Sequence, residues 1–270
     1  MKWIGNAFVY FGLFFVYQST IGSRGSYTTS SVLSGLVLAV PCLLLGAWLI
    51  GKAQGSEQAD RDRNVPDVIS DRSALFFLYL RPFDTTNRFQ LTDAYTNLFS
   101  WETWERDGFD DIERVVSRTL EATHPLIALG RPGEHRGAAR LPTSDLEWKV
   151  AVLDLIDRAK LIIIVPGPNP GTVWELEQLT RGNHLPKCLF IMPPSDLLFY
   201  RCADGVLSKE WDILRSQCNG FGLDLPEYRS GGALFRYTST LSQSVASRSL
   251  PPPDPVQWKE TFQELLQCGA

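Results

Sequence analysis

The chain has few residues of the kinds that bind metals or form disulfides. It contains five cysteines and three histidines in 270 residues. The cysteines are odd in number and no two have metal-ligand spacing, and the histidines form no HxxH or HExxH pattern. The sequence therefore predicts reduced thiols in a cytosolic setting and no metal site.

An excess of positive charge is also missing. Lys and Arg together number 26 against 30 Asp and Glu, and no run of basic residues is interleaved with aromatic ones. Proteins that bind a phosphate backbone need such a basic surface. The composition argues against nucleic acid as a partner, while 44% hydrophobic residues suffice for one domain with extra segments.

Two uncharged apolar stretches stand near the N-terminus, at residues 3–21 and 31–51. Each has about the 20 residues that span a hydrocarbon core, so we expect a transmembrane hairpin over residues 1–51. A secretory signal peptide is the alternative for the first stretch. No clear small-x-small cleavage site follows it, however, and the second stretch comes at once.

Basic residues beside these stretches predict an orientation. One side carries four of them and the short connecting loop carries only Arg24; the four are Lys2, Lys52, Arg61 and Arg63. The positive-inside rule then places both termini in the cytoplasm, at the inner (plasma) membrane, with the lipid bilayer as a partner. Residues 52–72 are polar and mixed in charge, which is typical of a tether.

From residue 73 onward, unbroken apolar runs alternate with segments of helical period. The runs cover residues 75–80, 125–129, 161–165 and 187–192, and 233–237 is a further candidate. Apolar runs without polar alternation are typical of strands buried on both faces of a parallel sheet. We expect residues 73–270 to form one α/β domain with a doubly wound parallel sheet, whose ligands bind at the carboxyl ends of the strands.

Three segments between these runs have the period of amphipathic helices. One carries Ile112, Val116 and Leu120 at i, i+4 and i+8. The next carries Leu146, Val150 and Leu153 at i, i+4 and i+7, and the third starts near Thr172. This spacing predicts a β-α-β order in which each helix places these residues on the sheet.

The stretch GTVWELEQL, residues 171–179, follows the third run and contains Trp174 and Glu175. A carboxylate at the carboxyl edge of the sheet suits cleavage of an N-glycosidic bond, because that reaction develops positive charge on the ribose. The leaving base would stack on Trp174. The alternatives are that Glu175 complements the helix dipole and that Trp174 packs in the core or at its rim.

Two further strand ends carry candidate binding residues. The stretch GRPGEHRGAAR, residues 130–140, combines Gly130 with Arg136 and Arg140, which suit an anion; an ordinary solvated loop is the alternative. Arg81 and Asp84 follow the first strand, where they reach a ligand, pair with each other or cap a turn.

The order of elements resembles bacterial Toll/interleukin-1 receptor-like (TIR-like) domains over residues 75–194. The resemblance is carried by LYLRPFD, FDDIERVVSRTL, LIALGRPGEHRGAARL, EWKVAVLDLIDRAKLIIIVPG and GTVWELEQL. It implies a flavodoxin-like fold and, in the members that cleave NAD, a catalytic glutamate that falls on Glu175. Other members are assembly modules. GTVWEL also resembles nucleoside deoxyribosyltransferases, whose glutamate attacks the sugar carbon and likewise falls on Glu175.

Our leading hypothesis is therefore a membrane-tethered TIR-like signalling or effector protein that self-associates. It would bind a nucleotide and hydrolyse NAD, a substrate and not a cofactor, through Glu175. The second hypothesis is a non-enzymatic interaction module of the same fold, and the third makes the hairpin itself the effector that disturbs the membrane.

Overall fold

The computed structural model describes eleven stretches of the chain. They are residues 2–20, 29–81, 89–91, 110–120, 123–130, 137–144, 146–195, 200–202, 207–238, 245–252 and 254–267. These residues divide into two units, one up to Asp60 and one from Arg61 onward.

The first unit contains helix α1 (Lys2–Thr20) and the beginning of helix α2 (Thr29–Ser70). The two helices run antiparallel and approach closely at glycines. A Cβ atom on Gly46 would stand 2.6 Å from Cγ2 of Val9, and one on Gly12 would stand 2.8 Å from Cγ of Leu43. Only residues without a side chain permit this approach of the two backbones.

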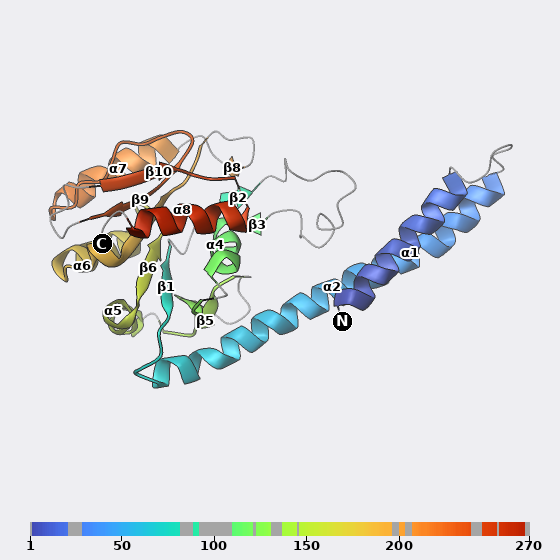
Figure 1. The fold of residues 1–270 in the computed structure, drawn as a ribbon, viewed down its shortest axis with the longest axis horizontal. Helices are drawn as coiled ribbons and strands as arrows, with labels where there is room; N and C mark the ends of the chain where they lie inside the picture. The colour runs from blue at the N-terminus through green and yellow to red at the C-terminus, as the bar shows by residue number, and fades with distance from the viewer. Residues whose placement is uncertain are drawn as a thin grey trace. The chain divides into compact units, whose positions relative to one another are not determined.

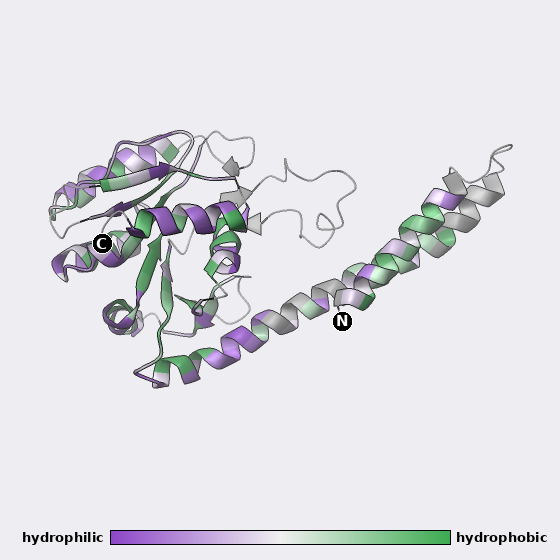
Figure 2. Cartoon of the chain, in the orientation of Figure 1, coloured by the Kyte–Doolittle hydropathy of each residue, from purple (hydrophilic) through white to green (hydrophobic). Residues whose placement is uncertain are grey.

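Within the described residues, no helix combines the length and the hydropathy that a membrane crossing requires. This finding contradicts the predicted transmembrane hairpin and the predicted place in the inner membrane. The prediction relied on the absence of charge, but an uncharged stretch also holds polar groups such as Asn6 and Gln18 of α1. Residues 52–70, expected as a tether, continue helix α2, whose second half is largely hydrophilic (Figure 2).

The second unit is built on a seven-stranded sheet of order β10-β9-β7-β6-β1-β4-β5 (Figure 1). The parallel strands are β1 (Phe77–Leu80), β4 (Leu126–Leu129), β5 (Ala139–Leu141), β6 (Leu161–Ile164) and β7 (Cys188–Met192). Strand β9 (Ala233–Tyr237) is antiparallel to β7, and β10 (Val245–Ser249) is antiparallel to β9. The predicted α/β class with a mostly parallel sheet is confirmed.

A second, small sheet joins three short antiparallel strands that the sequence patterns did not indicate. They are β2 (Phe89–Leu91), β3 (Asp110–Asp111) and β8 (Tyr200–Cys202). Strand β3 leads directly into helix α4 (Ile112–Leu120), so this sheet adjoins the start of that helix.

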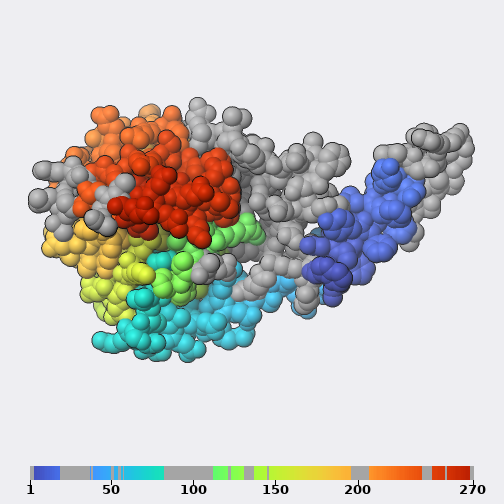
Figure 3. All heavy atoms as spheres, in the orientation of Figure 1, coloured from blue at the N-terminus to red at the C-terminus, as the bar shows by residue number. Residues whose placement is uncertain are grey.

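Helices cover both faces of the large sheet. On one face lie α5 (Trp148–Arg158), α6 (Pro170–Arg181) and α7 (Leu207–Asn219), and on the other lie α4 and α8 (Pro255–Gln267), which is dark red in Figure 3. A 3-10 helix, η2 (Leu185–Lys187), leads into β7. Strands β1, β4, β6 and β7 are buried along their whole length because both faces are covered.

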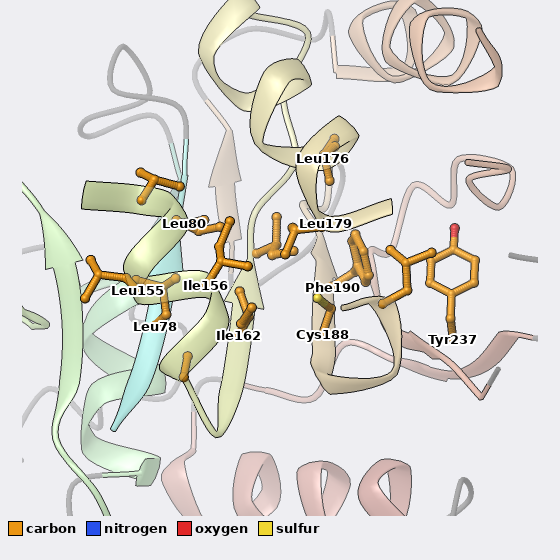
Figure 4. Packing of buried hydrophobic residues seen from close by; sticks show 14 of the residues in the cluster. Leu78, Leu80, Leu155, Ile156, Ile162, Leu176, Leu179, Cys188, Phe190 and Tyr237 are labelled. Carbon is orange, nitrogen blue, oxygen red and sulfur yellow. The ribbon is translucent and has the colours of Figure 1, made fainter. Parts of the chain in front are cut away.

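Helix α5 buries a different face from the one predicted. Val152, Leu155 and Ile156 pack on the sheet, whereas Leu146 and Val150 are 94% and 72% exposed. Figure 4 shows Leu155 and Ile156 beside side chains of β1 and β6. Both sets of residues have the spacing of one helical face, so periodicity alone did not distinguish them.

The end of helix α2 covers edge strand β5. Oδ1 of Asp62 accepts a hydrogen bond from the backbone N–H of Arg140 at 2.8 Å, and Nη2 of Arg158 donates to the carbonyl of Ile69 at 2.9 Å. Val65 belongs to the hydrophobic core. The last turns of α2 thus satisfy an edge group that would otherwise be available to another strand.

Candidate active site

Helix α6 begins at the carboxyl edge of the sheet, directly after β6. The side chain of Asn169 accepts a hydrogen bond from the backbone N–H of Thr172 at 2.9 Å, and Pro170 occupies the first turn. No acidic residue stands in that turn, and Glu175 belongs to the second turn. Because unpaired N–H groups occur only in the first turn, the helix dipole does not explain the position of Glu175.

The carboxyl of Glu175 is enclosed. Glu175 lies among the buried residues of α6, which also include Thr172, Leu176 and Leu179, and it is only 4% exposed. Its Oε2 atom is buried without a hydrogen-bond partner among the described residues. Burial raises the pKa of Glu175 to about 8, so the group is mainly protonated at neutral pH. A buried carboxyl without a partner, with a strongly raised pKa, is a candidate functional group.

Trp174 belongs to the contact between α5 and α6. Its ring meets that of Trp148 edge to face, with centroids 5.0 Å apart. Nζ of Lys149 lies 5.2 Å from the centroid of Trp174. An ammonium over this ring opposes the stacking of a positively charged base, so Trp174 fits a packing position better than a platform for nicotinamide.

Arg81 and Arg140 converge on Glu113, at the start of α4. Nη2 of Arg140 lies 2.6 Å from Oε1 of Glu113, and Nη1 of Arg81 lies 3.3 Å from Oε2. The backbone N–H of Ala138 donates to Oε1 at 3.0 Å. Glu113 is fully buried and Arg140 is 2% exposed, whereas the side chain of Arg81 is 11% exposed. Arg81 is therefore the member of this cluster closest to solvent.

Glu113 was missed at the level of sequence. In the sequence it is one acidic residue at the start of a predicted helix, and its partner Arg140 is 27 residues away. No local pattern indicates a pair formed over such a distance.

The predicted site residues thus form two separate groups. Arg81 and Arg140 belong to the α4 face of the sheet, and Trp174 and Glu175 belong to the α5 and α6 face. Gly130 follows β4 with a φ of +152° and donates its N–H to the carbonyl of Leu141 at 3.2 Å, which extends the pairing with β5. Asp84 and Arg136 lie outside the described residues.

Across the described parts of the chain, no cluster of three His, Cys, Asp or Glu side chains could hold a metal ion. Comparison of the chain with protein-family models, with curated proteins and with solved structures finds no match.

Proposed function

We propose that the α/β domain is a TIR-like domain that binds a nucleotide such as NAD and cleaves its N-glycosidic bond through Glu175. The strand order supports the flavodoxin-like part of this proposal. Strands β4-β1-β6-β7-β9 follow the order 2-1-3-4-5 of such sheets, with the fifth strand reversed. In that order the ligand crevice lies at the carboxyl ends of the first and third strands, here β1 and β6.

Both strands are followed by a candidate residue. Arg81 comes directly after β1 and remains partly exposed beside Glu113, so it is the guanidinium suited to a phosphate. Helix α6, with Glu175, comes directly after β6. The observation that carries the proposal is the enclosed carboxyl of Glu175, because an unpartnered buried acid destabilises a fold and is retained where its ionisation is used.

The raised pKa of Glu175 suits a cationic substrate. The pyridinium of NAD carries positive charge, which favours the carboxylate and lowers the pKa of Glu175 when substrate binds. The carboxylate then stabilises positive charge on the ribose as the bond from C1′ to the ring nitrogen breaks. The bonding electron pair goes to that nitrogen, so nicotinamide leaves uncharged. Water adds to C1′ and releases one proton, giving ADP-ribose.

Release of nicotinamide from NAD by the full-length chain, followed by chromatography, tests this proposal. We expect Glu175→Gln to lower the rate at least a hundredfold. The control is Glu177→Gln on the same helix, whose side chain pairs with Arg181 and is 28% exposed; it should retain activity. Equal release by Glu175→Gln, or none by the unaltered chain at pH 6 to 9, would overturn the catalytic proposal.

A second candidate function is a non-enzymatic interaction module, and the outer face of α5 favours it. Val150 and Leu153 of α5 are exposed, as is Leu146 two residues before the helix, which gives an apolar stripe on the outside of the domain. Such a stripe suits contact between domains.

Sedimentation velocity of the full-length chain tests this candidate. If α5 mediates assembly, Val150→Lys should weaken self-association. Lys209→Glu, a charge change on the separate helix α7, should leave it intact. A chain that sediments identically with and without Val150→Lys would contradict the interaction function of this stripe.

A further inference from the structure

A cavity of about 300 Å³ lies between the end of α2 and the edge of the large sheet. Its walls come from α2, α4, the residues before β4, and strands β4 and β5. Val65, Val68, Leu126 and Ile127 supply apolar surface. The volume is within the range of pockets that hold small organic molecules.

Hydrogen bonds hold the walls in place. Asp62 of α2 accepts from the backbone of Arg140 on β5, and Arg158 of α5 donates to the carbonyl of Ile69 near the end of α2. The helix that closes the cavity is therefore fastened both to β5 and to α5. A ligand would meet a largely preformed site.

Polar groups of the lining gather at the carbonyl of Gly137. This oxygen accepts hydrogen bonds from Nη1 of Arg61 and from Oγ of Ser117, each at 3.1 Å. The guanidinium of Arg61 thus stands at the cavity wall, half-buried. The cavity thus has one cationic group, held in place by a hydrogen bond, and walls that are otherwise mainly apolar.

Basic side chains stand at the cavity and beside it. None of the described lining residues is acidic, and Nζ of Lys160 lies 3.1 Å from Nε2 of the lining residue His124. Asp62 of α2 is bonded to the backbone N–H of Arg140, and Glu113 of α4 to the Arg140 side chain. An anionic ligand therefore finds attraction here.

We propose that this cavity binds a small monocarboxylate with an apolar body. The carboxylate faces Arg61, and the body lies against Val65, Val68 and Ile127. A single guanidinium among mainly apolar walls suits one negative charge, whereas a phosphate group requires several donors. This site is independent of the function proposed for Glu175.

Calorimetric titration of the full-length chain with 2-naphthoate tests the proposal, and 2-naphthylmethanol serves as the uncharged probe of matching shape. We expect saturable binding of naphthoate and at least tenfold weaker binding of the alcohol. Arg61→Met should weaken naphthoate binding at least tenfold, while Arg63→Met, an exposed position on the same helix, should not. Absence of saturable binding, equal binding of both probes, or equal effects of the two substitutions would overturn the proposal.

A second substitution separates loss of the site from loss of the fold, because Arg61 also bonds Gly137. Val68→Phe fills the cavity from α2 and should abolish naphthoate binding without removing charge. Val256→Phe, at an exposed position of α8, is the matched control. Thermal melts of all variants establish folding, and a folded Val68→Phe chain with unchanged affinity would exclude this cavity as the site.

Discussion

Glu113 and Arg140 form a buried ion pair in which one guanidinium nitrogen, Nη2, lies 2.6 Å from Oε1 and 2.8 Å from Oε2 of the carboxylate. Arg81 and the backbone N–H of Ala138 complete the surroundings of the carboxylate. The pair joins α4 to β5, at the edge of the sheet. The side chain of Arg140 is therefore buried in a structural contact. Arg81 is more exposed, and it is the guanidinium of this cluster that a ligand could reach.

Removing one partner of this pair should cost far more than removing both. Glu113→Leu leaves the guanidinium of Arg140 buried without its carboxylate, and we expect a loss of about 3 to 5 kcal/mol in the free energy of unfolding. Urea unfolding measures it. Glu113→Leu combined with Arg140→Met should lose less than Glu113→Leu alone. A double variant whose loss equals the sum of the two single losses would mean that the two side chains do not interact.

Gly137 should tolerate no side chain. Its φ is +145°, and a Cβ atom there would stand 3.0 Å from both Cγ and Oε1 of Glu113. We expect Gly137→Ala to cost about 2 kcal/mol or more in the free energy of unfolding. Gly222 has a φ of +85° and no atom within 4 Å of the position that a Cβ atom would take, so Gly222→Ala measures the backbone strain alone. Gly231 has the same open space without a positive φ, so Gly231→Ala measures the effect of replacing a glycine. Equal losses for Gly137→Ala and Gly222→Ala would contradict the clash with Glu113.

Glu175 should make the fold less stable as the pH rises. Its pKa is about 8 in the folded chain against an ordinary value of 4.5, so between these values the folded state binds more protons than the unfolded state. The free energy of unfolding then falls by up to about 1.4 kcal/mol per pH unit through this window. Urea unfolding from pH 5 to 8 should show Glu175→Gln gaining stability over the unaltered chain as the pH rises. A constant difference would show that the pKa is not raised.

The two faces of α5 should respond differently to truncation. Leu155 is 1% exposed and Leu153 is 39% exposed, although the two residues are close on one helix. Leu155→Ala should lower the free energy of unfolding by about 2 to 5 kcal/mol because it leaves a cavity in the core. Leu153→Ala should change it by less than about 1 kcal/mol. Thermal and urea unfolding of both variants decide this, and a greater loss at Leu153 would restore the face predicted from the sequence.

The sheet was predictable from sequence because its strands are apolar throughout. Runs such as residues 161–165 are buried on both faces, and this environment leaves a pattern that needs no knowledge of distant residues. The face of α5 was not predictable in the same way, since it depends on which residues the neighbouring strands and helices contact.

The candidate site was predictable only in part. A carboxylate after β6 was visible in the sequence, but its enclosure depends on how α6 packs. The pairing of Glu113 with Arg140 joins elements far apart in the chain. Residues 3–21 and 31–51 carry no charge, but a stretch without charge can still hold polar residues that lower its hydropathy. The membrane prediction derived from the absence of charge was wrong.

The antiparallel pairing of β9 with β10 affects the order in which the sheet can assemble. An antiparallel neighbour is reached by a short connection, and β9 and β10 are separated only by residues 238–244. Strand β1 lies between β4 and β6, which are both distant from it in the chain, so its pairing closes long loops. The C-terminal strand pair can therefore form from local contacts while the centre of the sheet, where β1 lies, is the slower part to complete.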